Sequence, residues 1–157
     1  MFEQILEHRF TSKKRIICLI LVESVKLFEV NVKALRILLV EDNHNFRNSA
    51  IRFINANMRF EILTWVSSAE EAIKKIKANS LDLILMDISM DGINGIEASK
   101  IIRTSNKTIK IILLTMSDNS EYRNEALAAG ANEFIPKMEF SDRLIPAINN
   151  IFMDYQK

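Results

Sequence analysis

Five short, mostly apolar runs recur along this chain, and a segment with helical periodicity follows each of them. The runs are Leu35–Val40, Phe60–Val66, Leu81–Met86, Ile109–Leu114 and Phe134–Ile135. Apolar runs that are not broken by regular polar alternation predict strands that are buried on both faces. Such strands belong to parallel sheets that helices cover on both sides. The pattern therefore predicts an α/β fold with a doubly wound, five-stranded parallel sheet.

The segments between these runs carry the predicted helices. The first helix follows Asn43 and has one apolar face, made of Phe46, Ala50, Phe53 and Ile54. Ser68 and Glu71 have the spacing of a capping box, which predicts the start of the second helix. The other three helices are predicted at Ile96–Arg103, Glu121–Ala129 and Asp142–Tyr155. Pro146 then falls near the first turn of the last helix, where proline is tolerated.

Polar side chains stand where the predicted strands end. Glu41 and Asp42 follow the first strand, Asp87 follows the third, Thr115 the fourth, and Lys137 comes directly after the fifth. Ligands of open α/β sheets bind beyond the carboxyl ends of the strands, where these side chains converge. A single carboxylate such as Asp42 after a strand is readily explained as a helix cap. Five polar residues that meet at one edge of the sheet instead predict a functional site.

Three carboxylates held close together repel one another unless a cation compensates them. Carboxylate oxygens, backbone carbonyls and water are the ligands that Mg²⁺ prefers. A carboxylate such as Asp87 is also a recognised nucleophile that forms an acyl phosphate. Lys137 and the metal would stabilise charge on the phosphoryl oxygens, and the Thr115 hydroxyl would donate a further hydrogen bond.

Four motifs, taken in order and at their spacings, carry a family resemblance. They are ILLVEDN (37–43), LDLILMDISMDGINGIE (81–97), IILLTMSDN (111–119) and GANEFIPK (130–137). From about Val32 to Lys157 the chain resembles the receiver domain of bacterial two-component response regulators, in the CheY-like superfamily. The resemblance implies a flavodoxin-like (βα)5 fold with strand order 2-1-3-4-5, and it leaves residues 1–31 as an N-terminal extension.

The resemblance also implies a role for each residue at the strand ends. Asp42 matches a direct ligand of Mg²⁺ (or Mn²⁺), and Glu41 matches a ligand that acts mostly through water. Asp87 matches the phosphoryl acceptor and a metal ligand, and the backbone carbonyl of Ser89 matches a further ligand. No other cofactor is implied.

Three more positions match the parts that respond to phosphorylation. Thr115 matches the hydroxyl that moves toward the new phosphoryl group, and Lys137 matches the cation that pairs with it. Phe134 matches the aromatic switch residue, which rotates inward when Thr115 shifts. The expected output is a changed surface on the fourth helix, the fifth strand and the fifth helix. The resemblance implies a histidine kinase or phosphotransfer protein as phosphoryl donor, a downstream partner protein, and a homodimer in many relatives.

The chain departs from the family pattern at three positions. Asp91 stands where a proline is common, and Met138 follows Lys137 where many members have another proline. A residue other than proline after the lysine is typical of the subfamily that is often fused to helix-turn-helix domains. Met116 is larger than the residue that commonly follows the threonine. We expect it to restrict access to the acyl phosphate and to lengthen its lifetime.

Two other functions fit parts of the same pattern. A receiver-like scaffold would bind partners without phosphorylation, which the intact acidic pair, acceptor and lysine disfavour. A phosphatase of the haloacid-dehalogenase type also uses an aspartyl phosphate and Mg²⁺, but it normally has a second aspartate where this chain has Ser89. The sequence thus favours a phosphoacceptor switch over a multiple-turnover enzyme.

Charge and cysteine content set the expected surroundings. The net charge of +1 gives no electrostatic sign of nucleic-acid or membrane binding. Cys18 is the one cysteine, which favours a reducing cytoplasm. The apolar run Ile16–Val22 is too short to span a bilayer. Residues 1–31 are either an added helix or a segment that precedes a natural start at Val32. Since two residues follow Tyr155, we expect no output domain and action by docking.

Overall fold

The computed structural model describes residues 34–78, 80–117 and 119–153 of the chain. The predicted extension at residues 1–31 lies outside these residues, so the structure leaves that prediction as it stands. Of the predicted domain at 32–157, the described part begins at Ala34. Within the described residues, no helix has the length and apolar character needed to cross a membrane.

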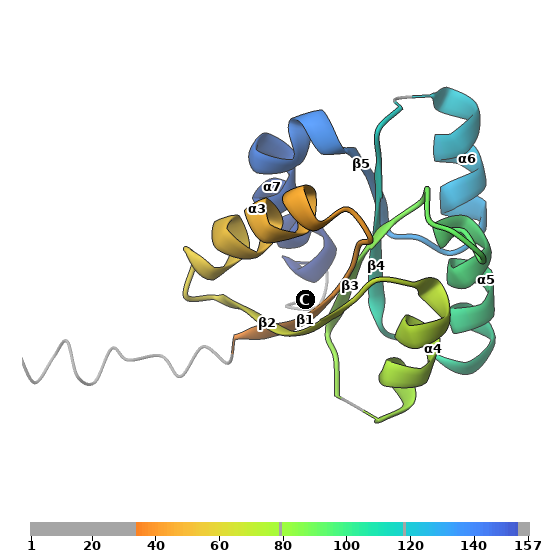
Figure 1. Ribbon diagram of the computed structural model, residues 1–157, viewed down its shortest axis with the longest axis horizontal. Coiled ribbons are helices and arrows are strands. Elements are labelled where there is room, and N and C mark those ends of the chain that lie inside the picture. The colour runs from red at the N-terminus through yellow and green to blue at the C-terminus, as the bar shows by residue number, and fades with distance from the viewer. Residues whose placement is uncertain (1–33, 79, 118, 154–157) are drawn as a thin grey trace, which may run out of the picture. The chain divides into compact units, whose positions relative to one another are not determined.

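One parallel sheet forms the centre of the described domain (Figure 1). Its five strands are β1 (Leu35–Val40), β2 (Phe60–Val66), β3 (Leu83–Asp87), β4 (Lys110–Thr115) and β5 (Glu133–Pro136). They lie in the order β2-β1-β3-β4-β5, and every neighbouring pair is parallel. The predicted fold class and strand order are therefore confirmed.

Helices cover both faces of this sheet. They are α3 (His44–Asn55), α4 (Ala69–Ala78), α5 (Gly95–Ser105), α6 (Ser120–Ala128) and α7 (Phe140–Met153), with a 3₁₀ turn at Lys137–Glu139. In Figure 1, α3 and α7 lie on one side of the sheet, and α4, α5 and α6 lie on the other. The serine predicted to cap the second helix does so, because the Ser68 hydroxyl accepts a hydrogen bond from Glu71 N at 3.3 Å.

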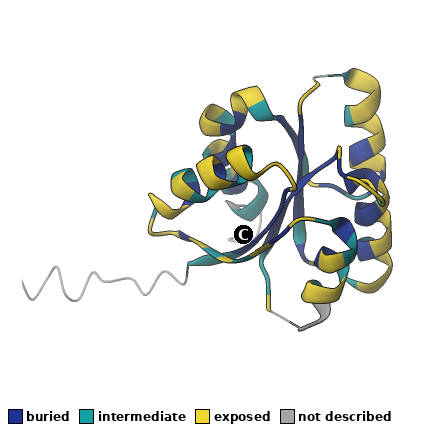
Figure 2. Ribbon diagram, viewed as in Figure 1, coloured by how far each residue is buried: buried dark blue, intermediate teal, exposed yellow. Residues whose placement is uncertain are grey.

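The central strands are buried because both of their faces meet helices. Neighbouring residues of β1 point into different cores: Ile37 and Leu39 pack on the α3–α7 side, and Leu38 and Val40 on the other side. Every residue of β3 is buried, as are most residues of β1 and β4, whereas the edge strand β2 is buried only at its two ends (Figure 2). This packing rigidly fixes the carboxyl ends of the strands, on which the polar side chains stand.

Several element boundaries differ from the prediction by one or two residues, among them the starts of the third strand and of the last helix. The third strand begins at Leu83 instead of Leu81. Asp82, just before it, donates its N–H to the Arg36 carbonyl at 2.9 Å, and its carboxylate forms a two-pronged ion pair with the Arg36 guanidinium. The last helix begins at Phe140 instead of Asp142, because the 3₁₀ turn runs directly into it. Pro146 consequently lies inside α7 and beyond its first turn, where it removes one backbone hydrogen bond.

Arg103 at the end of α5 joins three segments of the α4–α5–α6 side. Its guanidinium donates hydrogen bonds to the carbonyl oxygens of Gly130 (2.9 Å), Asn106 (3.2 Å) and Ile109 (2.7 Å). A fourth bond reaches Asn132 Oδ1 at 3.1 Å. Only a planar group with several fixed donors can serve acceptors in this arrangement.

Replacing Arg103 should therefore destabilise the fold. We expect Arg103→Ala to lower the free energy of unfolding by about 2–3 kcal/mol, since charge-assisted hydrogen bonds are lost and carbonyl groups lose their partner. Arg103→Lys should recover only part of this loss. Urea unfolding measures both, with Lys100→Ala on the exposed side of the same helix as a control within about 0.5 kcal/mol of the parent. Equal losses for Arg103→Ala and Lys100→Ala would contradict the assignment.

Candidate functional site

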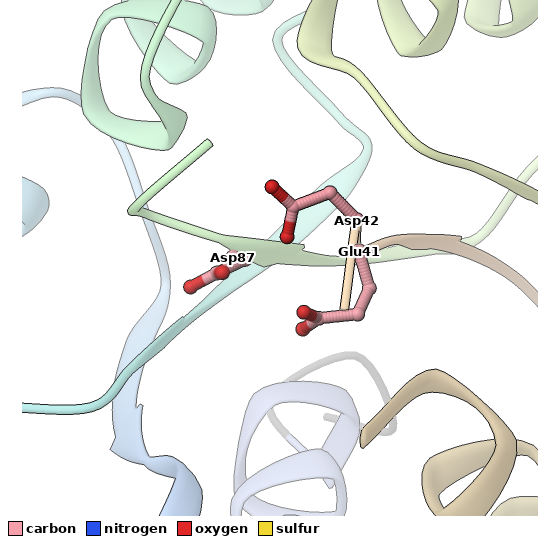
Figure 3. Close-up of side chains that lie close together, drawn as sticks. All are labelled: Glu41, Asp42 and Asp87. Atoms are coloured by element: carbon pink, nitrogen blue, oxygen red, sulfur yellow. The ribbon is translucent and has the colours of Figure 1, made fainter. Parts of the chain in front are cut away.

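Three carboxyl groups lie together where β1 and β3 end. The two strands are neighbours in register, with Val40 opposite Met86, so the residues that follow come side by side. Glu41 and Asp42 extend from β1, and Asp87 is the last residue of β3. Figure 3 shows the side chains of Glu41 and Asp42 leaving the chain on opposite sides, with the Asp87 carboxylate beside them. Glu41 and Asp87 are buried, whereas Asp42 is exposed.

Lys137 connects two of these carboxylates. Its Nζ lies 2.8 Å from Asp87 Oδ2 and 2.8 Å from Glu41 Oε2. The lysine follows β5, at the far edge of the sheet from β1, and its side chain crosses to the site with only 6% of its surface exposed. The Nζ also lies 4.7 Å from the centroid of the Phe46 ring, whose face favours a cation. One ammonium group thus compensates two buried acids.

Glu41 is a buried carboxylate close to charges of both signs. Burial raises the pKa of Glu41, the hydrogen bond from Lys137 opposes that rise, and the charge of Asp87 adds to it. Lys137 directs its hydrogen bond to Oε1 at 3.0 Å, and Asn43 N donates to the same oxygen at 3.1 Å. Oε2 has only the close ammonium contact, and among the described residues no hydrogen bond is directed at it. That oxygen retains accepting capacity.

The donor set fits a hard divalent cation. Glu41, Asp42 and Asp87 each offer one oxygen, and these oxygens lie within 4.8 Å of one another. An all-oxygen set with room for water suits Mg²⁺ or Mn²⁺. Ser89 is exposed two residues beyond Asp87, and its N–H donates to Asp87 Oδ1 at 3.3 Å, which fixes the turn that presents the Ser89 carbonyl.

The predicted switch residues lie close by but are not bonded to the acids. The Thr115 hydroxyl donates to the Ser117 carbonyl and accepts from Ser117 N, both at 3.1 Å. Within the described residues it makes no hydrogen bond to Asp87. Phe134 is fully buried in the core on the α4–α5–α6 side, with the Arg123 guanidinium 5.0 Å from its ring centroid. In this structure the aromatic ring therefore occupies the inward position.

Arg47 is a residue of this site that the sequence did not indicate. Its guanidinium donates to the backbone carbonyls of Glu41 (3.0 Å) and Asp42 (3.3 Å), and it stacks 4.2 Å above the Trp65 ring of β2. It thus fixes the backbone of the acidic pair from the first helix. An arginine six positions after an acidic residue is a common pattern, so only the folded geometry identifies the contact.

Comparison with known proteins matches this architecture to one family. The family model described as "Response regulator receiver domain" matches residues 37–149. Chemotaxis protein CheY of Bacillus subtilis (strain 168) is 34% identical over 114 residues, which are 73% of this chain and 94% of that protein. Response regulator UvrY of Escherichia coli (strain K12) is 30% identical over 118 residues, which are 75% of this chain and 54% of that protein.

Other relatives are longer than the matched region. Transcriptional regulatory protein DegU of Brevibacillus brevis is 28% identical over 76% of this chain and 51% of its own length. The chain thus spans about half the length of the curated DegU and UvrY relatives that it matches. Among solved structures, a two-component response regulator of the LuxR family from Aurantimonas sp. SI85-9A1 has a TM-score of 0.74 and 28% identity, covering 78% of this chain and 87% of its own.

The buried lysine gives a direct test of the site's electrostatics. Lys137→Met leaves two buried carboxyl groups without their cation, so we expect the free energy of unfolding at pH 7 to fall by about 3 kcal/mol in the presence of a chelator. Urea unfolding measures the loss. Lys100→Met is the matched control, because Lys100 is exposed and its 3.7 Å ion pair with Glu125 should contribute little. A loss for Lys137→Met no larger than that of the control would contradict this account.

Proposed function

The chain belongs to the response regulator receiver domain family, and we propose that Asp87 accepts a phosphoryl group that switches the surface of the domain. Receiver domains of this family serve phosphorylation-activated two-component signalling. The observation that supports Asp87 most strongly is its position at the end of β3, where its carboxylate meets Lys137 at 2.8 Å beside Glu41 and Asp42. Glu41 is also buried and in contact with Lys137, but it follows β1, whereas Asp87 ends β3, where the family resemblance puts the acceptor.

The proposed reaction transfers a phosphoryl group from a phosphohistidine. A carboxylate oxygen of Asp87 attacks phosphorus, so that a P–O bond forms while the P–N bond to the imidazole breaks. The imidazole leaves with the electron pair of that bond and takes up a proton. Lys137 is already placed to neutralise charge on Asp87, and it would pair with a phosphoryl oxygen of the product. Acetyl phosphate would serve as a small-molecule donor by the same attack.

Mg²⁺ (or Mn²⁺) would bind beside Asp87. We propose Asp42 and Asp87 as direct carboxylate ligands, the Ser89 carbonyl as another, and Glu41 as a ligand that acts through metal-bound water, with Oε2 as the oxygen that retains accepting capacity. The cation would neutralise the oxygens of the transferring phosphoryl group. Arg47 donates hydrogen bonds to the backbone carbonyls of Glu41 and Asp42. It thereby keeps the acidic pair in position without using the side-chain carboxylates as acceptors.

Phosphorylation would reach the output surface through Thr115. A new phosphoryl oxygen would accept the hydrogen bond that the hydroxyl now gives to Ser117, and this would pull the loop after β4 toward Asp87. Phe134, on the neighbouring strand β5, fills the core behind this loop and would be held inward by that shift. The surface that changes is formed by α6, β5 and α7, which are the fourth helix, fifth strand and fifth helix of the domain.

The partners follow from the family and remain proposals for this chain. A histidine kinase or phosphotransfer protein would supply the phosphoryl group, and a partner protein or a second copy of the chain would read the α6–β5–α7 surface. We propose no direct contact with nucleic acid for the described domain, and we place it in the cytoplasm. Phosphatases of the haloacid-dehalogenase type have an acid at the position of Ser89. The serine therefore supports a phosphoacceptor switch over a multiple-turnover hydrolase.

The acceptor assignment is tested by two matched acid-to-amide variants. Asp87→Asn should abolish labelling by acetyl phosphate with Mg²⁺, because an amide cannot form the acyl phosphate. Asp91→Asn removes an exposed acid of the same loop and should be labelled as the parent is. Mass spectrometry detects the added phosphoryl group. Retained labelling of Asp87→Asn would show that the acceptor is another residue, and an unlabelled parent would favour a scaffold that binds partners without phosphorylation.

Met116 tests the control of phosphoryl lifetime. It follows Thr115 directly, and 69% of its surface is exposed at the edge of the site. If its side chain limits access of water, Met116→Ala should shorten the half-life of the phosphorylated form several-fold. Phosphate release after removal of the donor measures this half-life. Met138→Ala, which changes another exposed methionine next to the site, is the control. Equal half-lives for Met116→Ala and the parent would contradict the hypothesis.

A further inference from the structure

The loop that follows Asp87 is closed tightly at its base. The Ile88 carbonyl accepts hydrogen bonds from Met90 N at 3.2 Å and from Gly95 N at 3.0 Å, so the loop returns to its starting point before α5 begins. A side chain at position 95 would overlap the carbonyl oxygen of Asp87, so this close return requires glycine. The base of the loop is therefore fixed by its own backbone.

The tip of the same loop is held by a different element. Gly92 has a φ of +79°, and the N–H of the next residue, Ile93, is directed at α4. Glu70, in the first turn of α4, accepts that hydrogen bond through Oε1 at 3.1 Å. A Cβ added at Gly92 would lie 2.7 Å from the same oxygen, which shows how closely the carboxylate approaches the backbone. The bond therefore joins the loop before α5 to the first turn of α4.

We propose that Glu70 is a positioning residue for the acceptor site. By fastening the tip of loop 88–94 to α4, its carboxylate holds the Ser89 carbonyl in the place that Mg²⁺ needs. The inference rests on the proposed function, since it concerns the same site, but among the described residues Glu70 makes no hydrogen bond to the acceptor or to its proposed metal ligands. It acts through the backbone of Ile93.

The charge of Glu70 suits this role. The pKa of its carboxyl group is lowered, chiefly by hydrogen bonds from the backbone N–H groups of Glu70 itself and of Ile93. The Ser68 hydroxyl and the positive charge of Lys74 lower it further. An acid in the first turn also meets the positive end of the α4 helix. The fastening group is thus a carboxylate that several donors stabilise at once.

Three variants separate positioning from general effects. Glu70→Ala removes the acceptor for Ile93 N, whereas Glu70→Gln keeps a carbonyl oxygen in nearly the same place and should restore the bond. Glu71→Ala is the matched control, because Glu71 is the next residue of the same helix turn and its side chain is exposed. All three change the charge of the turn by the same amount, so a charge effect alone would affect them equally.

The measurements are the hydrogen exchange of the Ile93 amide without metal and the affinity for Mg²⁺ by calorimetry. For Glu70→Ala we expect faster exchange at Ile93 and a Mg²⁺ dissociation constant raised about tenfold, the usual effect of removing a group that orients a ligand. Glu70→Gln and Glu71→Ala should stay within about twofold of the parent. Thermal unfolding of the two alanine variants should agree, which separates loop positioning from a loss of stability.

The outcomes distinguish this inference from the function on which it rests. A parent protein that binds Mg²⁺ and is phosphorylated, with Glu70→Ala equal to it in Mg²⁺ affinity or in Ile93 exchange, overturns the positioning role alone. A Glu70→Gln variant as weak as Glu70→Ala also overturns it, because the hydrogen bond would not be the cause. A parent that neither binds Mg²⁺ nor accepts a phosphoryl group overturns the proposed function, and the positioning role with it.

Discussion

The ammonium group of Lys137 between Glu41 and Asp87 is the interaction on which the candidate site depends. Burying carboxyl groups at the ends of strands costs free energy unless a cation compensates them. Lys137 supplies that cation from the end of β5, two strands away from β3. Its side chain is covered by the same helices that cover the strands, so the ion pair and the fold require each other. A site built in this way exists before any ligand arrives.

The parallel sheet explains why these groups meet at all. Strands β1, β3, β4 and β5 all end at one edge, and each contributes the first polar residues after its buried run. Because neighbouring strands are paired in a fixed register, the residue at which each strand ends determines where its polar side chain lies along this edge. The apolar runs therefore do more than fill a core, since they set the distances between the polar residues that follow them.

This relation also explains how far the sequence could predict the structure. Apolar runs and their polar ends sufficed for the fold class and for the meeting of Glu41, Asp42, Asp87 and Lys137, whereas the strand order came from the family resemblance. Contacts made by long side chains to the backbone could not be predicted, because Arg47 and Glu70 look like ordinary residues on solvated helix faces. The start of the last helix was missed for a similar reason, since the 3₁₀ turn after Lys137 has no sequence signal of its own.

The balance of charge at the site explains why the backbone contacts of Arg47 and Glu70 matter for metal binding. Three carboxyl groups face one ammonium, and an acyl phosphate with roughly 1.5 to 2 negative charges would replace one of them, so that the site gains about one negative charge. Lysine alone would leave most of this negative charge uncompensated, so we expect the phosphorylated state to need a divalent cation. A cation with strict octahedral geometry tolerates little movement of its ligands. The backbone that carries those ligands must then be held from outside the ligand set, which is what Arg47 does for the acidic pair and what Glu70 is placed to do for the loop after Asp87.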